Sequence, residues 1–114
     1  MKIQKINELL NAEVVCGEIT NDSEIALAFA SDLMSEVLTI KKDGIVLLTG
    51  LCTIQAIRTA EMSDIHCIIF VRGKKVSEEM IELANENNII LLECQYSMFK
   101  ASGILYSEGV QPVY

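Results

Sequence analysis

The sequence predicts an α/β fold with a mainly parallel central sheet of about five strands and helices on both faces. Short apolar runs recur along the chain, and between them lie segments of about ten residues whose apolar side chains follow helical spacing. Strands that alternate with such helices form right-handed βαβ units, which cover both faces of a parallel sheet. The 114 residues, 51% of them hydrophobic, are enough for one domain with a substantial core.

The first half of the chain is predicted to contain two helices and three strands. The run IALAFASD is almost entirely apolar, which is typical of a strand buried on both faces. Asp32 can cap the second helix, and Gly44 can end it in a left-handed conformation. The side chains expected to face the core from this helix are Leu33, Met34, Val37 and Leu38. The expected helices span 2–11 and 32–41, and the strands span 12–18, 25–32 and 45–50, with a polar turn over 19–24.

The second half of the chain alternates helices and strands more regularly. Thr53 and Ser77 stand at the expected starts of two helices, where a hydroxyl can accept a hydrogen bond from the first turn. Methionines at inward helical positions are expected to fill the core, namely Met34, Met62, Met80 and Met98. The expected helices span 53–62, 77–87 and 96–109, and the strands span 66–71 and 88–94. We expect one domain over 1–109 and a loose tail over 110–114.

The charge and apolar patterns exclude several classes of function. The chain has 16 acidic and 9 basic residues, a net charge of −7, and no basic stripe with interleaved aromatics, so nucleic-acid binding is disfavoured. The start of the chain lacks the apolar region of a signal peptide, and no apolar run approaches the length of a membrane span. We therefore expect a cytoplasmic protein that does not interact with membranes.

The four cysteines are expected to be reduced thiols, mostly small core residues, because none belongs to a C-x-x-C pair. Cys52 and Cys94 follow strands at the same predicted edge of the sheet, so these thiols can approach each other. His66 begins its strand at the opposite edge and has no nucleophile near it in any motif. We therefore predict no metal site, no bound cofactor and no catalytic residue.

The first candidate binding site is the turn formed by Thr49, Gly50 and Thr53. It follows a parallel strand and precedes a helix, and α/β proteins often bind ligands at this position. Backbone amides at the start of the helix can receive an anion, and the threonine hydroxyls can add hydrogen bonds. The alternative is an ordinary strand-to-helix turn in which Thr53 is only a cap.

Five other residues complete the candidate set at or near this edge. Ser31 and Asp32 end the preceding strand, although a helix cap explains both of them equally well. Arg72 opens the basic turn RGKK, which can neutralise a phosphate or can simply be a solvated loop. Tyr96 can line a pocket or contact a second subunit. Arg58 lies on the helix over 53–62, where it can pair with an acid or reach a partner chain.

The order of these segments resembles the DRTGG-domain family over nearly the whole chain. The segments that carry the resemblance are NAEVVCGE, AFASDLMSEVL, LLTG, IRTAEMSDI and the long run from IIFVRGKK to ILYSEG. The chain is most similar to stand-alone members that resemble the amino-terminal domain of HPr kinase, several of which are encoded near iron-only hydrogenase components. The resemblance implies an α/β domain, often dimeric, with a sensing or regulatory role and no established activity.

The chain departs from the motif that names the family. The turn after the third strand contains no Asp-Arg, and the turn after the fourth reads Val71-Arg72-Gly73 instead of Thr-Gly-Gly. No P-loop occurs in the chain. We predict a non-catalytic regulatory or small-ligand-sensing module that is dimeric and accessory to hydrogenase or redox metabolism, with a nucleotide or another phosphorylated small molecule as the expected ligand. The alternatives are an interaction protein without a small ligand and a small enzyme that acts on a phosphate ester.

Overall fold

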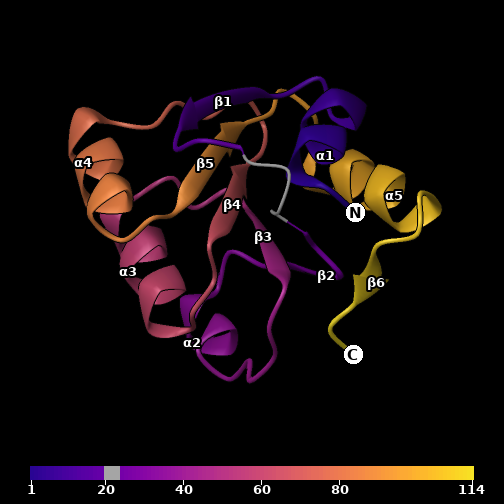
Figure 1. The fold of residues 1–114 in the computed structure, drawn as a ribbon, viewed down its shortest axis with the longest axis horizontal. Coiled ribbons are helices and arrows are strands. Elements are labelled where there is room, and N and C mark those ends of the chain that lie inside the picture. Colours follow the sequence, from indigo (N-terminus) through magenta and orange to yellow (C-terminus); the bar gives the residue numbers. More distant parts are fainter. Residues whose placement is uncertain (20–23) are drawn as a thin grey trace.

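The α/β fold is confirmed by the computed structural model, which describes residues 1–19 and 24–114 (Figure 1). A mostly parallel six-stranded sheet lies between two layers of helices. Of the polar turn predicted over 19–24, residues 20–23 lie outside the described residues. The helices are α1 (Ile3–Leu9), α2 (Met34–Val37), α3 (Ile54–Met62), α4 (Glu78–Glu86) and α5 (Met98–Ser107). The strands are β1 (Glu13–Cys16), β2 (Leu27–Ala30), β3 (Ile45–Thr49), β4 (Cys67–Phe70), β5 (Ile90–Glu93) and β6 (Gln111–Pro112).

The strand order is β1-β5-β4-β3-β2-β6, with β1 the antiparallel strand. The neighbours β2, β3, β4 and β5 are parallel and in continuous register, so their carboxyl ends meet at one edge of the sheet. The three central strands consist almost entirely of Ile, Leu, Val and Cys and are buried on both faces, as parallel strands require.

The helices divide into two layers. Apolar side chains of α2, α3 and α4 pack on one face of the sheet, and those of α1 and α5 pack on the other. The connections after β2, β3 and β4 therefore run over the first face, whereas the connection after β5 runs over the second. Adjacent strands whose connections leave toward opposite faces form a topological switch point, where α/β proteins bind ligands. In this fold the switch point lies between the carboxyl ends of β4 and β5.

The region around β2 differs from the sequence-based expectation. β2 was predicted to be buried on both faces, but its first three residues are only partly buried and Ala30 is exposed, because its outer neighbour, β6, is two residues long. The helix that follows is four residues long instead of about ten. Met34 and Val37 face the core as predicted, whereas Leu33 and Leu38 are exposed. Met62 was also predicted to face the core, but it is 70% exposed. The side of α3 that faces the core contains Ala60 instead.

The expectation of a loose C-terminal tail was wrong. Residues 111–112 form β6, which pairs in parallel with β2 and extends the sheet from five strands to six. Val110 and Val113 are buried, and the carbonyl of Val113 accepts a hydrogen bond from Lys42 Nζ at 2.8 Å. A segment that buries two valines is part of the folded domain.

Candidate functional site

Asp32 connects the ends of β2 and β3. Its Oδ1 accepts hydrogen bonds from the Gly50 amide at 2.6 Å and from Thr49 Oγ1 at 3.1 Å. Thr49 Oγ1 in turn accepts a hydrogen bond from the Leu51 amide at 3.1 Å. The sequence offered a helix cap as the structural alternative for Asp32, but the residue that directly precedes α2 is Leu33, and the Asp32 carboxylate bonds to Thr49 and Gly50 instead. The Asp32 carboxylate thus accepts the hydrogen bond of the Thr49 hydroxyl, which was predicted to contact an anionic ligand.

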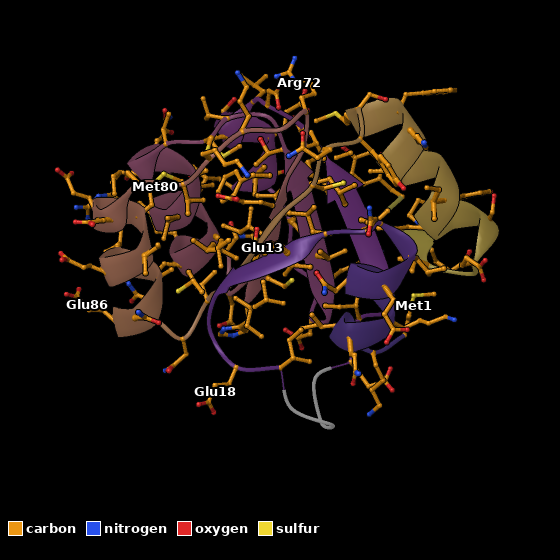
Figure 2. All side chains as sticks on the ribbon, turned by 90° about the horizontal axis from the view of Figure 1, so that it is seen from above. Met1, Glu13, Glu18, Arg72, Met80 and Glu86 are labelled. Atoms are coloured by element: carbon orange, nitrogen blue, oxygen red, sulfur yellow. The ribbon has the colours of Figure 1, made fainter. Side chains whose placement is uncertain are left out.

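Arg72 covers this cluster from the end of β4. Its guanidinium lies over Gly50, so that a Cβ at position 50 would collide with it, and Nη2 is 3.6 Å from Asp32 Oδ2. Thr49 and Gly50 are therefore buried, whereas about half of the Arg72 side chain remains exposed. Figure 2 shows Arg72 at the far end of the molecule from Glu18. The threonine and the glycine do not line an open pocket; the exposed polar surface here belongs to Arg72.

Residues 72–75, the basic turn, are held in place by the segment that follows β5. The Arg72 amide donates a hydrogen bond to the Tyr96 carbonyl at 2.8 Å, and the Gly73 amide donates one to the Cys94 carbonyl at 2.9 Å. Both turn residues have a left-handed backbone, with φ of 64° at Arg72 and 72° at Gly73. The basic turn is thus a defined structure that spans the switch point between β4 and β5, and a flexible loop would not show these bonds.

Glu93, the last residue of β5, is a buried carboxylate that fixes the other end of the basic turn. Its two oxygens accept hydrogen bonds from Lys75 Nζ at 3.2 Å and from the Val76 amide at 2.9 Å. Sequence reasoning missed this residue, although an acid at the end of the apolar run IILLEC was a signal. A buried carboxylate needs a cation and hydrogen-bond donors, and the nearby basic turn contains both.

Tyr96 and Lys100 complete the arrangement at the start of α5. Lys100 Nζ lies 3.9 Å from the centroid of the half-buried Tyr96 ring, which is a cation–π contact. Lys100 was also missed, because only the fold shows that the first turn of α5 returns to the basic turn. The basic turn and the start of α5, which meet at the switch point, therefore contain four of the nine basic residues of this acidic chain. These four are Arg72, Lys74, Lys75 and Lys100.

Three predicted site residues have other environments. Ser31 Oγ accepts a hydrogen bond from the Leu33 amide at 3.0 Å and donates one to Glu36 at 3.4 Å, which fits the structural alternative of helix initiation. Thr53 is the N-terminal flanking residue of α3, but its side chain makes no cap hydrogen bond. Arg58 is exposed on α3 and forms no ion pair with any residue that the structure describes.

The thiols do not form a site in the described part of the chain. Cys52 Sγ donates to the Lys75 carbonyl beside the α3 layer, and Cys94 packs in the core beside α5, so the two lie on opposite faces of the sheet. Burial raises the pKa of both thiols, and that of Cys67 to about 12. Within residues 1–19 and 24–114, no group of three or more His, Cys, Asp or Glu side chains is placed to hold a metal ion.

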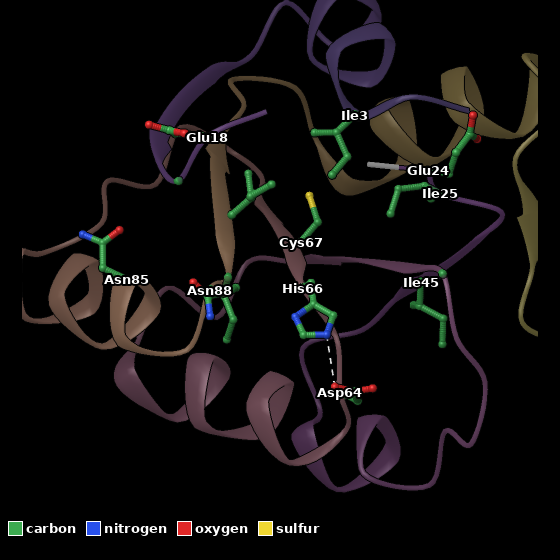
Figure 3. Close-up of a pocket in the computed structure, with 14 residues that line it drawn as sticks. Ile3, Glu18, Glu24, Ile25, Ile45, Asp64, His66, Cys67, Asn85 and Asn88 are labelled. Atoms are coloured by element: carbon green, nitrogen blue, oxygen red, sulfur yellow. Dashed lines mark hydrogen bonds and ion pairs between the residues drawn. The ribbon is translucent and has the colours of Figure 1, made fainter. Parts of the chain in front are cut away.

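A cavity of about 620 Å³ lies at the opposite, amino edge of the sheet (Figure 3). Its polar lining includes Glu18, Glu24 and Asp64, and His66 contacts Asp64 at 3.1 Å. Glu24 is paired with the Met1 ammonium and with Lys2, so Glu18 and Asp64 are the carboxylates that repel a phosphorylated ligand here, whereas the basic turn attracts one. The two edges of the sheet thus have opposite electrostatic character, and the candidate anion site is the carboxyl edge.

Comparison with known proteins agrees with this architecture. The family profile of the DRTGG domain matches residues 5–107. The chain belongs to the DRTGG-domain family. In this DRTGG domain, Arg72 has a left-handed backbone, a conformation that glycine adopts more readily than other residues.

A solved structure with the same fold is the regulatory region of Clostridium perfringens pyrophosphatase, which contains CBS and DRTGG domains and is in complex with its activator, diadenosine tetraphosphate. The two chains superpose with a TM-score of 0.71 at 19% sequence identity. The alignment covers 98% of this DRTGG domain and 48% of the pyrophosphatase region, so the chain spans about half of that region. No curated protein matches the chain.

No helix among the described residues has the length and apolar character needed to cross a membrane.

Proposed function

We propose that this DRTGG domain is a non-catalytic regulatory module of the cytoplasm that binds a phosphorylated small molecule, a nucleotide in the first place, at the carboxyl edge of the sheet. The observation that carries the proposal is the basic turn. It places Arg72 and Lys75 at the topological switch point, opposite Lys100 and the ring of Tyr96. Guanidinium and ammonium groups bind phosphate oxygens, and an aromatic ring offers a surface on which a base can stack.

The contact between Arg72 and Asp32 is weak enough to be exchanged for a ligand. Their nitrogen and oxygen are 3.6 Å apart, and both side chains are about half exposed. An ion pair of this kind contributes between about 0 and 1 kcal/mol. A phosphate group forms two short charge-assisted bonds with a guanidinium, so it can displace Asp32 at little cost.

The solved relative supports the choice of a nucleotide. That regulatory region, which contains a DRTGG domain, binds diadenosine tetraphosphate as an activator. The proposal for this chain is that a nucleotide phosphate bridges Arg72 and Lys75 while the base lies near Tyr96. A ligand that contacts both the basic turn and α5 holds these two segments together. Ligand binding can then change how the module contacts other chains.

We further propose that the module acts as a homodimer, as the family resemblance implies. The resemblance to stand-alone members that are similar to the HPr kinase amino-terminal domain and encoded near hydrogenase components supports a narrower proposal. In that proposal, the process that the module regulates belongs to hydrogenase or redox metabolism.

Thermal unfolding in the presence of ligands tests the binding proposal. The probes are ATP, diadenosine tetraphosphate, AMP and inorganic phosphate, with adenosine as the probe that lacks phosphate. A ligand present at about 100 times its Kd stabilises the native state by about 2.7 kcal/mol, which raises the midpoint of a domain of this size by roughly 10–20 °C. We expect a shift with at least one nucleotide and none with adenosine.

The matched variants are Arg72→Gln and Arg58→Gln. Both remove one exposed guanidinium, but only Arg72 lies on the basic turn. We expect Arg72→Gln to abolish the midpoint shift and Arg58→Gln to retain it. Equal shifts in both variants, or no shift of the unmodified protein with any phosphorylated probe, would contradict the proposed site.

A further inference from the structure

We infer that one side of α5 and the groove beside it form the contact between two copies of this chain. The α5 patch consists of Phe99, Ser102, Gly103 and Tyr106. Phe99 and Tyr106 are 89% and 67% exposed, and they lie two helical turns apart on the same side of the helix. Gly103 lies between them, and no atom would come within 4 Å of a Cβ at this position. A second backbone can therefore approach the helix closely here.

An apolar groove runs along the same side of α5. It has a volume of about 130 Å³ and separates the helix from β2 and β6. Ser102 and Tyr106 belong to both the patch and the groove, and the buried hydroxyl of Ser102 has no hydrogen-bond partner among the described residues. The other groove residues are Ala28, Ala30, Leu48, Leu105, Val110, Gln111 and Pro112. An apolar cavity of about 150 Å³ accommodates benzene, so this groove is close to the size of a phenylalanine ring.

The patch and the groove are complementary to each other, which is what a two-fold contact between identical chains requires. The helix α5 supplies the exposed ring of Phe99 and also one wall of the groove, and the groove is close in size to that ring. When two α5 helices cross near Gly103 about a two-fold axis, Phe99 of each copy can enter the groove of the other. A different partner would need its own aromatic ring to fill the groove, and it would still leave Phe99 uncovered.

Charge and area also favour a second copy. The chain has a net charge of −7, so two copies repel each other over most of their surface, but residues 97–107 contain no acid and one lysine. An aromatic side chain buries 150–250 Å². At their exposures, Phe99 and Tyr106 can together contribute roughly a third to a half of the about 800 Å² that each partner buries in a standard interface.

This inference rests on the homodimer of the proposed function, and sedimentation equilibrium over a wide range of protein concentrations tests it. We expect the unmodified chain to reach twice its mass of 12.6 kDa. Phe99→Glu places a charge in each of the two grooves and should weaken the dimer about a hundredfold or more. Ala30→Phe fills the groove from within the chain and should weaken the dimer without adding charge.

Met62→Glu is the matched control, because it adds the same charge at an exposed apolar residue on the opposite layer of helices. We expect it to leave the dimer unchanged. A monomer at every concentration overturns both the interface and the proposed homodimer. The α5 interface alone is overturned if Phe99→Glu or Ala30→Phe dimerises as tightly as the unmodified chain. It is also overturned if Met62→Glu weakens the dimer as much as Phe99→Glu does. The phosphate-dependent midpoint shift should survive in Phe99→Glu, which separates this test from that of the ligand site.

Discussion

At the scale of single residues, Arg72 is unusual in its backbone conformation. Among the described residues, four other than glycine have positive φ, and the other three are Asn11, Asp64 and Asn88, whose short polar side chains tolerate this region. An arginine in the left-handed region costs about 1–2 kcal/mol relative to its relaxed conformation. Strain of this kind persists where the surrounding structure enforces it, commonly at binding sites. Here the enforcing contacts are the two backbone hydrogen bonds to the segment that follows β5.

A comparison of Arg72→Gly with Arg72→Ala measures that strain. Both variants remove the guanidinium, but only glycine relaxes the left-handed backbone. We expect the glycine variant to be more stable than the alanine variant by about 1 kcal/mol in urea-induced unfolding, and neither to bind a phosphorylated probe. Equal stabilities would show that the turn adapts without strain, and ligand binding by either variant would show that Arg72 is dispensable.

At the scale of secondary-structure elements, β6 is a small strand with a large structural role. Deletion of residues 110–114 removes two buried valines and the outer neighbour of β2, whereas deletion of Tyr114 alone removes a side chain that is 88% exposed. We expect the longer deletion to lower the free energy of unfolding by at least about 3 kcal/mol, and the deletion of Tyr114 by less than about 1 kcal/mol. Calorimetry of both shortened chains is the measurement. A small loss in the longer deletion would mean that β6 is only loosely attached.

The elements that could be predicted from the sequence are those with a strong local pattern. The apolar strands β3, β4 and β5 and the amphipathic helices α3 and α4 have such a pattern. The burial of β2 and the existence of β6 depend on which strands become neighbours, and no local pattern specifies this order. The same limit applies to the candidate site. Arg72 and Tyr96 follow strands and could be predicted as site residues. The hydrogen bond between Asp32 and Gly50 could not be predicted, because it joins two elements whose relative position no local pattern specifies.

At the scale of the whole molecule, stability should decrease in alkaline solution because of a buried thiol. Cys67 lies on β4 in the centre of the sheet, and burial raises its pKa from 9.0 to about 12. The unfolded chain releases this proton at a lower pH than the folded chain, so the stabilisation is complete below pH 9 and is lost between pH 9 and pH 12. The expected loss is roughly 1.4 kcal/mol per pH unit in that window.

Urea unfolding between pH 8 and pH 11 measures this slope, with Cys67→Ala as the control. The alanine variant is less stable at all pH values because it leaves a small cavity, but the thiol contribution to its slope is absent. Other groups also titrate above pH 9, so the quantity of interest is the difference between the two slopes. Identical slopes would mean that the Cys67 thiolate is accommodated in the folded chain.

The pairing of both sheet edges has a consequence for the synthesis of the protein. β1, near the start of the chain, pairs with β5, and β6, at its end, pairs with β2, so both edges join segments that are far apart in sequence. The strands β2, β3, β4 and β5 can associate one after another in the order in which a ribosome produces them. β1 must wait for β5, and β2 stays without its outer neighbour until residues 111–112 leave the exit tunnel. Because such non-local pairings form slowly, we expect the domain to remain incomplete until β6 has been synthesised, with a bare sheet edge that a chaperone can recognise until then.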